Sequence, residues 1–255
     1  MRYADDEATV AKILAACRRA GICGLDTETY GHDISVSTAP HRATIHVWSL
    51  AVLTGERHPR GHRVASGFTL SRRALDWAAD FLADPGVLKI GWNLPHDLHA
   101  IENTGLALRG GRDGLPRCRV HCPHLPRHGL KTVGPALVGR TLSKYEDVVT
   151  QDVTEYVDGR GCICQGAVEG AVWDRPRCPS QGRNKAHRSI PVLRPIVRRR
   201  EQPLESIVPG HPLWTGLGAY AAEDAVTALE CWDWMDQNPA DNPPDPGWSP
   251  LVVTH

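Results

Sequence analysis

The hydrophobic and polar positions of the chain follow two spacings, one typical of strands and one typical of helices. Short runs rich in apolar, β-branched and aromatic residues predict buried strands at 22–25, 43–53, 63–65 and 87–90. The first three resemble a meander, because the second and third are joined by the turn-like segment 54–62. We therefore expect part of the sheet to be antiparallel.

Apolar residues at helical spacing predict helices at 12–19, 72–82, 130–138, 145–156 and 217–235. Ser71 is a suitable N-cap for the second of them. A further helix is expected after Asn93, a plausible N-cap, with Pro95 tolerated in its first turn and Gly105 where a C-cap glycine belongs. Strands and helices that alternate in this way predict an α/β domain.

A single domain is expected over residues 1–237, because a chain of 255 residues can be built around one core. Gly, Pro, Arg and Cys dominate from about 158 to 210, which predicts an irregular insertion, and 238–255 reads as a Pro-rich tail. No run approaches the roughly 20 apolar residues of a membrane span, and the acidic start does not resemble a secretory signal. We expect no membrane partner and a cytoplasmic location, or the host cytoplasm if a phage encodes the protein.

The net charge gives no argument for a polyanion partner, because 29 basic residues balance 29 acidic ones. Arginine is nevertheless concentrated at 57–63, 109–119 and 194–200, and such patches either neutralise phosphates or form a solvated surface. The eight cysteines are too sparse for a disulfide framework. Free thiols are therefore expected for most of them.

The first candidate for chemistry is the segment GLDTET at the end of the first strand. Asp26 and Glu28 are two residues apart in an extended chain, so their side chains point to the same face. Neighbouring carboxylates repel each other unless they share a proton, pair with arginine or bind a divalent cation. Alone, such a pair also fits ordinary surface acids.

Two later segments add acids at a strand–helix junction and on a long helix. In GWNLPHD, Asp97 lies in the first turn of a helix, where the helix dipole favours an anion. In AYAAEDA, Tyr220 and Asp224 are four residues apart and share a helix face, whereas Glu223 points elsewhere. Each segment alone has a plainer interpretation: a helix stabiliser for Asp97, and a core tyrosine with a solvated acid for the other pair.

Together the three segments supply four carboxylates that the order of strands and helices can bring to one end of the sheet. Oxygen ligands suit Mg²⁺, and two such ions about 4 Å apart can hold the attacking and leaving oxygens of a phosphodiester. A nuclease centre is therefore the hypothesis that explains all three segments at once.

In this order GLDTET, GWNLPHD and YAAEDA resemble the three motifs of the DEDD (DnaQ-like) 3′→5′ exonuclease superfamily. Tyr220 indicates the tyrosine branch, because Ala219 stands where the other branch carries histidine. The motifs look closest to the proofreading domain of family A DNA polymerases, and HGLKTVGPALVG at 128–139 resembles the helix that follows the second motif. The likeness covers about 20–105, 128–157 and 213–237.

The resemblance implies a ribonuclease H-like fold, a five-stranded mixed β-sheet flanked by α-helices. It implies two Mg²⁺ or Mn²⁺ ions held by Asp26, Glu28, Asp97 and Asp224. One ion would be bound by Asp26, Glu28 and Asp224, and the other mainly by Asp26, with Asp97 acting through water. Tyr220 would orient and help activate the water that attacks the terminal phosphate.

By the same resemblance, Thr27, Asn93 and Leu94 would lie near the terminal nucleotide. The implied activity is the release of nucleoside 5′-monophosphates from DNA, preferably single-stranded 3′ ends. Proofreading for a separately encoded DNA polymerase is one role that fits. The alternatives are a ribonuclease D-like exoribonuclease, which normally carries an additional helical RNA-binding domain, and a non-catalytic module that binds nucleic acid or a polymerase.

Two stretches depart from the family pattern. Between 105 and 128 the usual aspartate–threonine pair at a helix start is replaced by RGGRDGLPRCRVHCPHLPR. The second stretch, 159–209, has no counterpart in the family pattern. Soft ligands for a structural Zn²⁺ occur in both stretches: Cys118, His121 and Cys122 in the first, and Cys162, Cys164, Cys178 and His187 in the second. Because no paired CxxC occurs, unstructured loop cysteines are the favoured interpretation.

Overall fold

The computed structural model describes residues 3–30, 42–162 and 189–239. Its chain divides into two compact units, one made of Met1–Val149 with Pro203–His255 and the other of Thr150–Gln202. Within the described part of the chain, no helix is long and apolar enough to cross a membrane.

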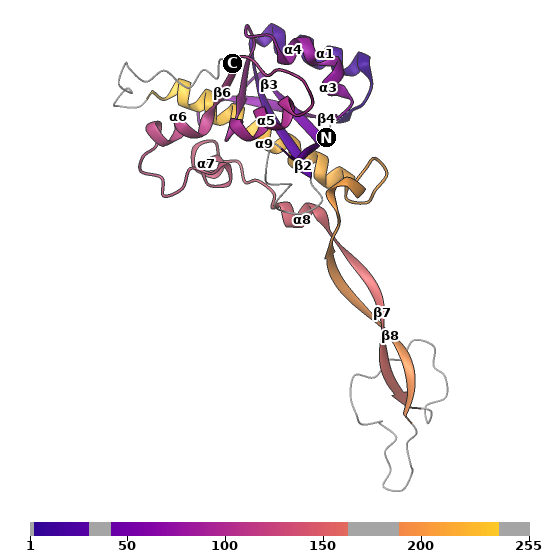
Figure 1. Ribbon diagram of the computed structural model, residues 1–255. Helices are drawn as coiled ribbons and strands as arrows, with labels where there is room; N and C mark the ends of the chain where they lie inside the picture. Colours follow the sequence, from indigo (N-terminus) through magenta and orange to yellow (C-terminus); the bar gives the residue numbers. More distant parts are fainter. Residues whose placement is uncertain (1–2, 31–41, 163–188, 240–255) are drawn as a thin grey trace. The chain divides into compact units, whose positions relative to one another are not determined.

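Six strands form the central sheet of the first unit, in the order β1-β4-β3-β2-β5-β6. Figure 1 shows this sheet with helices around it. Their bounds are β1 Tyr3–Ala4, β2 Ile22–Tyr30, β3 Thr44–Arg57, β4 Arg63–Ser71, β5 Leu88–Gly91 and β6 Gly111–Asp113. The expected meander is β2-β3-β4, which is antiparallel, whereas β1, β5 and β6 pair in parallel. The mixed sheet is confirmed, but it has six strands where the resemblance implies five, and neither β1 nor β6 is among the four segments that the sequence predicts as strands.

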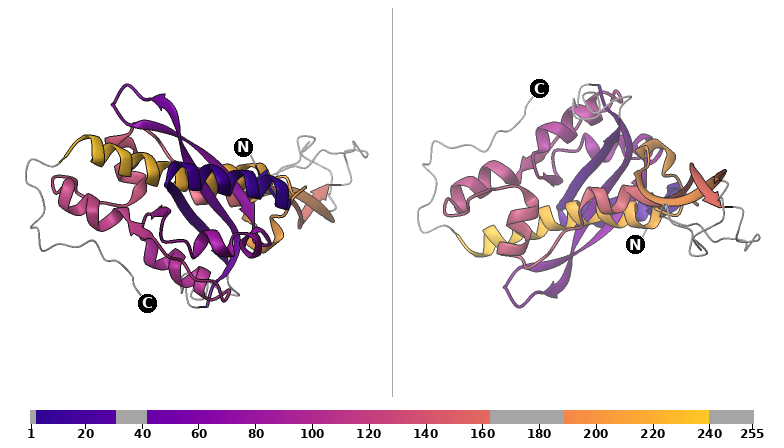
Figure 2. Two further views of the ribbon diagram at one scale, coloured as in Figure 1. Left: turned by 90° about the horizontal axis from the view of Figure 1, so that it is seen from above. Right: turned by 90° about the horizontal axis from the view of Figure 1, so that it is seen from below.

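Helices cover both faces of this sheet. They are α1 Glu7–Ala20, α3 Ala74–Trp77, α4 Ala79–Leu82, α5 Leu94–Glu102, α6 Gly114–His121, α7 Leu130–Leu137, α8 Tyr145–Val149, the 3₁₀ helix Leu204–Ser206 and α9 Trp214–Gln237. The views from above and below show α1 and α9 on opposite faces (Figure 2). The α1 face buries Leu25, Trp48 and Phe81, and the α9 face buries Ala51 and Leu229.

The helix predicted at 72–82 is wrong as a continuous element, because two single turns replace it. The N–H of Ala78 bonds the carbonyl of Leu75, three residues back, and this tighter turn ends α3. Ser71, the expected N-cap, is the last residue of β4, and Arg73 occupies the cap position without a side-chain bond.

The helix predicted at 145–156 is correct only as far as Val149. The chain continues as β7, Thr150–Cys162, which pairs antiparallel with β8, Ser189–Glu201. The β-branched residues from Thr150 onward favour a strand once a partner strand is present. These two strands form the second unit, so part of the stretch expected to be irregular is a two-stranded ribbon.

Several expectations for the second half fall on residues that the structure does not describe. Among them are the zinc candidates Cys164, Cys178 and His187, the side chain of Cys162, and all of the predicted tail from 240 onward.

Candidate metal centre

Strand β2 presents Asp26 and Glu28 on one face of the sheet. Asp26 lies opposite Ser49 of β3 and Glu28 lies opposite Val47, in a regular antiparallel ladder that shifts register only after Glu28. Since side chains alternate along a strand, both acids point to the α9 face, and the intervening Thr27 points away. The shared face that the sequence predicts is therefore present.

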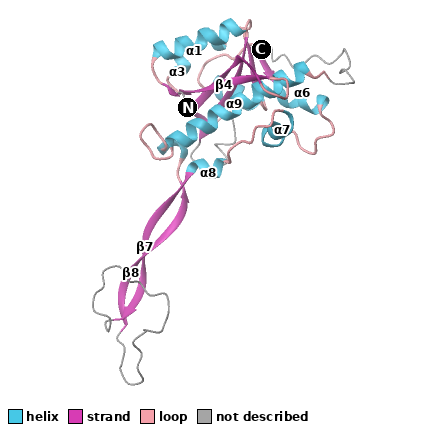
Figure 3. Ribbon diagram, turned by 180° about the vertical axis from the view of Figure 1, so that it is seen from behind, coloured by secondary structure: helices cyan, strands magenta, loops and turns pink. Residues whose placement is uncertain are grey.

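Close packing of α9 against the sheet brings its acid to the same place. A Cβ on Gly24 would lie 2.1 Å from the carbonyl oxygen of Ala225, so only glycine allows this approach. Two strand hydroxyls also hold the helix: Ser49 Oγ donates to the carbonyl of Ala221 at 2.7 Å, and Thr69 Oγ1 donates to that of Gly218 at 2.5 Å. From behind the molecule, α9 lies across the strands with α7 beside it (Figure 3).

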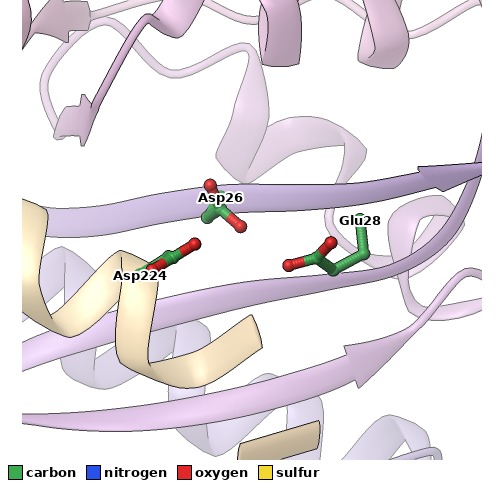
Figure 4. Close-up of side chains that lie close together, drawn as sticks. All are labelled: Asp26, Glu28 and Asp224. Atoms are coloured by element: carbon green, nitrogen blue, oxygen red, sulfur yellow. The ribbon is translucent and has the colours of Figure 1, made fainter. Parts of the chain in front are cut away.

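Asp26, Glu28 and Asp224 converge at this contact, with one carboxylate oxygen of each within 4.8 Å of the others. Their carboxylates point toward one another (Figure 4). All three side chains are partly exposed, so a cation can reach them. Within the described ranges, no other group of His, Cys, Asp or Glu has this geometry.

Burial and mutual repulsion disfavour the charged forms of these acids. Burial, followed by the charges of Asp97, Glu28 and Asp224, holds the pKa of Asp26 well above its ordinary value. Burial and then the charge of Asp224 raise the pKa of Glu28 to about 8. Burial raises the pKa of Asp224 to about 6, although Lys131 lowers it. A divalent cation among them would reverse these shifts.

One oxygen of Asp224 is left without a partner inside this cluster. Its Oδ1 is buried and has no hydrogen-bond partner. Buried carboxylate oxygens in native proteins are nearly always satisfied, by a donor or by a metal ion. A cation bound between the three carboxylates would satisfy this oxygen.

Asp97 lies beside the trio and is not part of it. It is buried in the first turn of α5, and its Oδ1 accepts from the backbone N–H of Thr27 at 2.8 Å and from Thr27 Oγ1 at 2.7 Å. The ladder between β2 and β5 stops at Gly24, so Asp97 supplies the acceptor that β5 no longer gives. Burial raises the pKa of Asp97 to about 7 against the lowering effect of Thr27.

Tyr220 lies one helical turn before Asp224 and is 8% exposed. Burial, and then the charges of Glu28 and Asp224, raise the pKa of its hydroxyl, which therefore stays protonated. The Tyr220 ring meets the ring of Tyr145 of α8 edge to face, with centroids 6.1 Å apart. Tyr220 also hydrogen-bonds Asp224, which lowers the pKa of that acid.

Three further residues were expected near the terminal nucleotide. The hydroxyl of Thr27 donates its hydrogen bond to Asp97. Leu94 is 6% exposed and fills the space over Gly91. Asn93 is exposed, with a φ of 66°, and it begins α5 without the expected side-chain cap bond; its N–H donates to Asp113 Oδ1 at 2.9 Å.

Asp113 belongs to the stretch that departs from the family pattern. Its Oδ1 also accepts from the N–H of Leu115 at 3.0 Å and so caps α6. A helix thus begins here without the aspartate–threonine pair. In the same region Cys118 and Cys122 are free buried thiols whose pKa values are raised by burial.

Sequence reasoning did not single out Lys131 or Tyr145, although both lie near the acids. Lys131 is in the first turn of α7, and its ammonium lies 5.4 Å from the centre of the Tyr220 ring. The HGLK segment at 128–131 was the only available signal, since it belongs to the helix that resembles the one after the second motif.

No protein-family model and no curated protein matches the sequence. Solved structures do match. Brucella melitensis NrnC bound to pGG is 14% identical, with a TM-score of 0.51 over 86% of this chain and 74% of that one. Trypanosoma brucei RNase D is 14% identical, with a TM-score of 0.55 over 95% and 66%. The catalytic core of RRP6 from Trypanosoma brucei is 12% identical, with a TM-score of 0.51 over 93% and 47%. The chain therefore has the ribonuclease H-like fold of DEDD-type 3′→5′ exonucleases, as the motifs implied.

Proposed function

We propose that the protein is a metal-dependent 3′→5′ exonuclease that releases nucleoside 5′-monophosphates from single-stranded DNA. The observation that carries this proposal is the unpartnered buried Oδ1 of Asp224, in a cluster of three acids that each place one carboxylate oxygen within 4.8 Å of the others. An all-oxygen donor set of this kind fits Mg²⁺ or Mn²⁺ better than zinc.

The four acids would bind the ions in two ways, depending on whether a hydrogen bond within the protein already engages the carboxylate. Asp26, Glu28 and Asp224 would hold one ion directly, and Asp26 would share a second ion with Asp97 through water. Such ions would supply a water of lowered pKa and neutralise charge on the phosphate. Asp97 suits the more distant role, because Thr27 already fixes one of its oxygens.

Tyr220 supports the assignment to the tyrosine branch. Its protonated hydroxyl donates to Asp224, and its oxygen can still accept a hydrogen bond from a water next to that acid, which would hold the water in an orientation suited to in-line attack. The T-shaped contact with the ring of Tyr145 stabilises the Tyr220 ring in this position. Tyr220 would thus orient the nucleophile and would not exchange a proton with it.

RNA is the second candidate substrate. The motifs favour DNA because they look closest to a polymerase proofreading domain, and a separately encoded polymerase is a corresponding partner. RNA is supported by the likeness in fold to Trypanosoma brucei RNase D, which is seen in a complex with RNA U12.

The test is cleavage of matched 5′-labelled single strands of DNA and RNA in Mg²⁺ or Mn²⁺. We expect stepwise shortening from the 3′ end, mononucleotide products and complete inhibition by EDTA. Asp26→Ala and Asp224→Asn should reduce the rate by about 100-fold or more, because each removes a group that would hold the ions. The relative rates on the two strands decide between DNA and RNA.

Glu223→Gln is the matched control, because Glu223 is the neighbouring acid on α9 but its carboxylate accepts from the N–H of Ser143 and not from the cluster. This variant should retain wild-type cleavage. Undiminished cleavage by Asp26→Ala would refute the proposed site. Tight strand binding without cleavage by the wild type would instead favour a non-catalytic module.

A further inference from the structure

Lys131 brings an uncommitted positive charge to the acid cluster. Its side chain is exposed, and it forms no ion pair with any residue that the structure describes. It nevertheless lies close to the cluster, because its ammonium is 5.4 Å from the centre of the ring of Tyr220, which precedes Asp224 by one turn of α9. The ammonium thus lies near the acids without being neutralised by one of them.

The packing of α7 on α9 fixes where Lys131 lies. Gly134, one turn after Lys131, is so close to α9 that a Cβ there would lie 2.9 Å from Cγ2 of Thr227. The segment before α7 is held by the indole of Trp92, which donates to the carbonyl of His128 at 2.8 Å. Lys131 therefore occupies an anchored helical turn.

A cation at this position would act on an incoming strand. A phosphodiester that approaches Asp26, Glu28, Asp97 and Asp224 meets strong negative charge, which bound ions offset only in part. Lysine offers three N–H donors, and an ammonium next to a phosphate oxygen forms a charge-assisted hydrogen bond. The contact with the Tyr220 ring would contribute little by itself at an exposed site.

We propose that Lys131 binds a non-bridging oxygen of the phosphate that is cleaved and holds it over the acid cluster beside Tyr220. This inference rests on the proposed function and adds the residue that positions the reacting phosphate. Lys131 forms and breaks no covalent bond, and its proton remains on the ammonium throughout.

The experiment compares Lys131→Met and Lys131→Arg with Lys12→Met, which removes the same charge from an exposed position on α1. Binding of a short fluorescein-labelled oligothymidylate is measured in Ca²⁺ over a range of salt concentrations. Cleavage of the same strand, and of the p-nitrophenyl ester of thymidine 5′-monophosphate, is measured in Mn²⁺. The ester has a single phosphate, so it reports only on the group that reacts.

For Lys131→Met we expect the slope of log affinity against log salt to become shallower by about 0.7, the value for one phosphate contact on a single strand. We expect kcat/KM to fall about 10- to 100-fold on both substrates, the range for a lost hydrogen bond to a charged group. Lys131→Arg should restore most of the slope and rate, and Lys12→Met should match the wild type.

Three outcomes would overturn the inference. An unchanged salt slope would mean that Lys131 touches no phosphate. A loss on the oligonucleotide but not on the ester would place the contact at a phosphate that does not react. A slope change of equal size in Lys12→Met would mean that the loss of a positive charge anywhere on the surface produces the effect. If the wild type cleaves neither substrate, the proposed function fails, whereas the binding measurement still decides whether Lys131 contacts phosphate.

Discussion

Asp26, Glu28 and Asp224 extend their carboxylates into a partly buried space in which each negative charge opposes the others. Burial is the first cause of every raised pKa in the cluster, and the unfolded chain has no such penalty. The folded protein therefore binds more protons than the unfolded chain between the ordinary pKa and the raised one. Stability must then fall as pH rises through that interval.

This argument predicts how the metal-free protein responds to pH. In EDTA, Tm should fall as pH rises from the ordinary Glu value of 4.5 toward about 8, the raised pKa of Glu28. Mg²⁺ or Mn²⁺ should raise Tm more at the upper end, because the ligands must lose protons to bind an ion. Calorimetric scans at both ends, with and without metal, measure the effect.

The Glu28→Gln variant tests whether the acid cluster causes the fall in Tm with rising pH. It removes a repelling charge while keeping the shape, so the fall in Tm should shrink and the metal-free protein should gain about 1 kcal/mol at the upper end of the interval. Cleavage should be lost in the same variant. A Tm in EDTA that drops equally in wild type and Glu28→Gln would show that other groups cause it.

The element that decides the site is α9, because it carries both Tyr220 and Asp224 across the sheet. Its distance from β2 is set at Gly24, where a Cβ would meet the carbonyl oxygen of Ala225 at 2.1 Å. Backbone atoms cannot move aside as a side chain can, so the helix itself would have to shift. The spacing between Asp26 and Asp224 thus depends on the absence of one methyl group.

Gly24→Ala should therefore impair both stability and function. We expect a loss of about 1–3 kcal/mol from the free energy of unfolding, the usual range for overpacking. Cleavage should fall even under conditions where the variant is folded, because α9 is displaced. Urea unfolding and the cleavage assay measure the two effects.

Gly55→Ala is the matched control. Gly55 lies in the same meander, on β3, and a Cβ there would meet nothing within 4 Å. The variant should keep wild-type stability and cleavage. Equal losses in the two variants would mean that the close approach at Gly24 is not what positions α9.

At the scale of the whole molecule, the two units differ in how they are held together. Among the residues whose side chains the structure describes, the buried hydrophobic clusters are made of residues of the first unit. The second unit is a two-stranded ribbon within the described residues, and such ribbons are marginally stable alone. The first residue of β7, Thr150, pairs with the last residue of β8, Glu201, so the chain enters and leaves the ribbon at neighbouring positions.

Replacing Thr150–Gln202 by a short Gly/Ser linker should therefore leave the first unit folded. We expect cooperative unfolding and retained cleavage of short strands, since all the residues of the metal centre are in the first unit. Circular dichroism melting and the cleavage assay would check this. Loss of folding would show that the ribbon is part of the core, and selective loss of binding to long strands would give the ribbon a role in substrate capture.

Local spacing along the chain was enough to predict much of the site. Asp26 and Glu28 had to share a face because β2 is extended, and Tyr220 and Asp224 had to share a face because α9 is helical. These relations follow from backbone geometry and need no partner. The meander was predictable for a different reason, because the short turn-like segment 54–62 joins two strand-forming runs.

Only the tertiary structure decided what these faces meet. Packing at Gly24 brings Asp224 to the β2 acids, while the end of the β5 ladder leaves Asp97 bound to Thr27 and outside the trio. The contact of α7 with α9 places Lys131 over Tyr220, and pairing with β8 turns the residues after Val149 into a strand. Each of these depends on contacts between residues far apart in the chain, which periodicity cannot specify because it records only the local conformation.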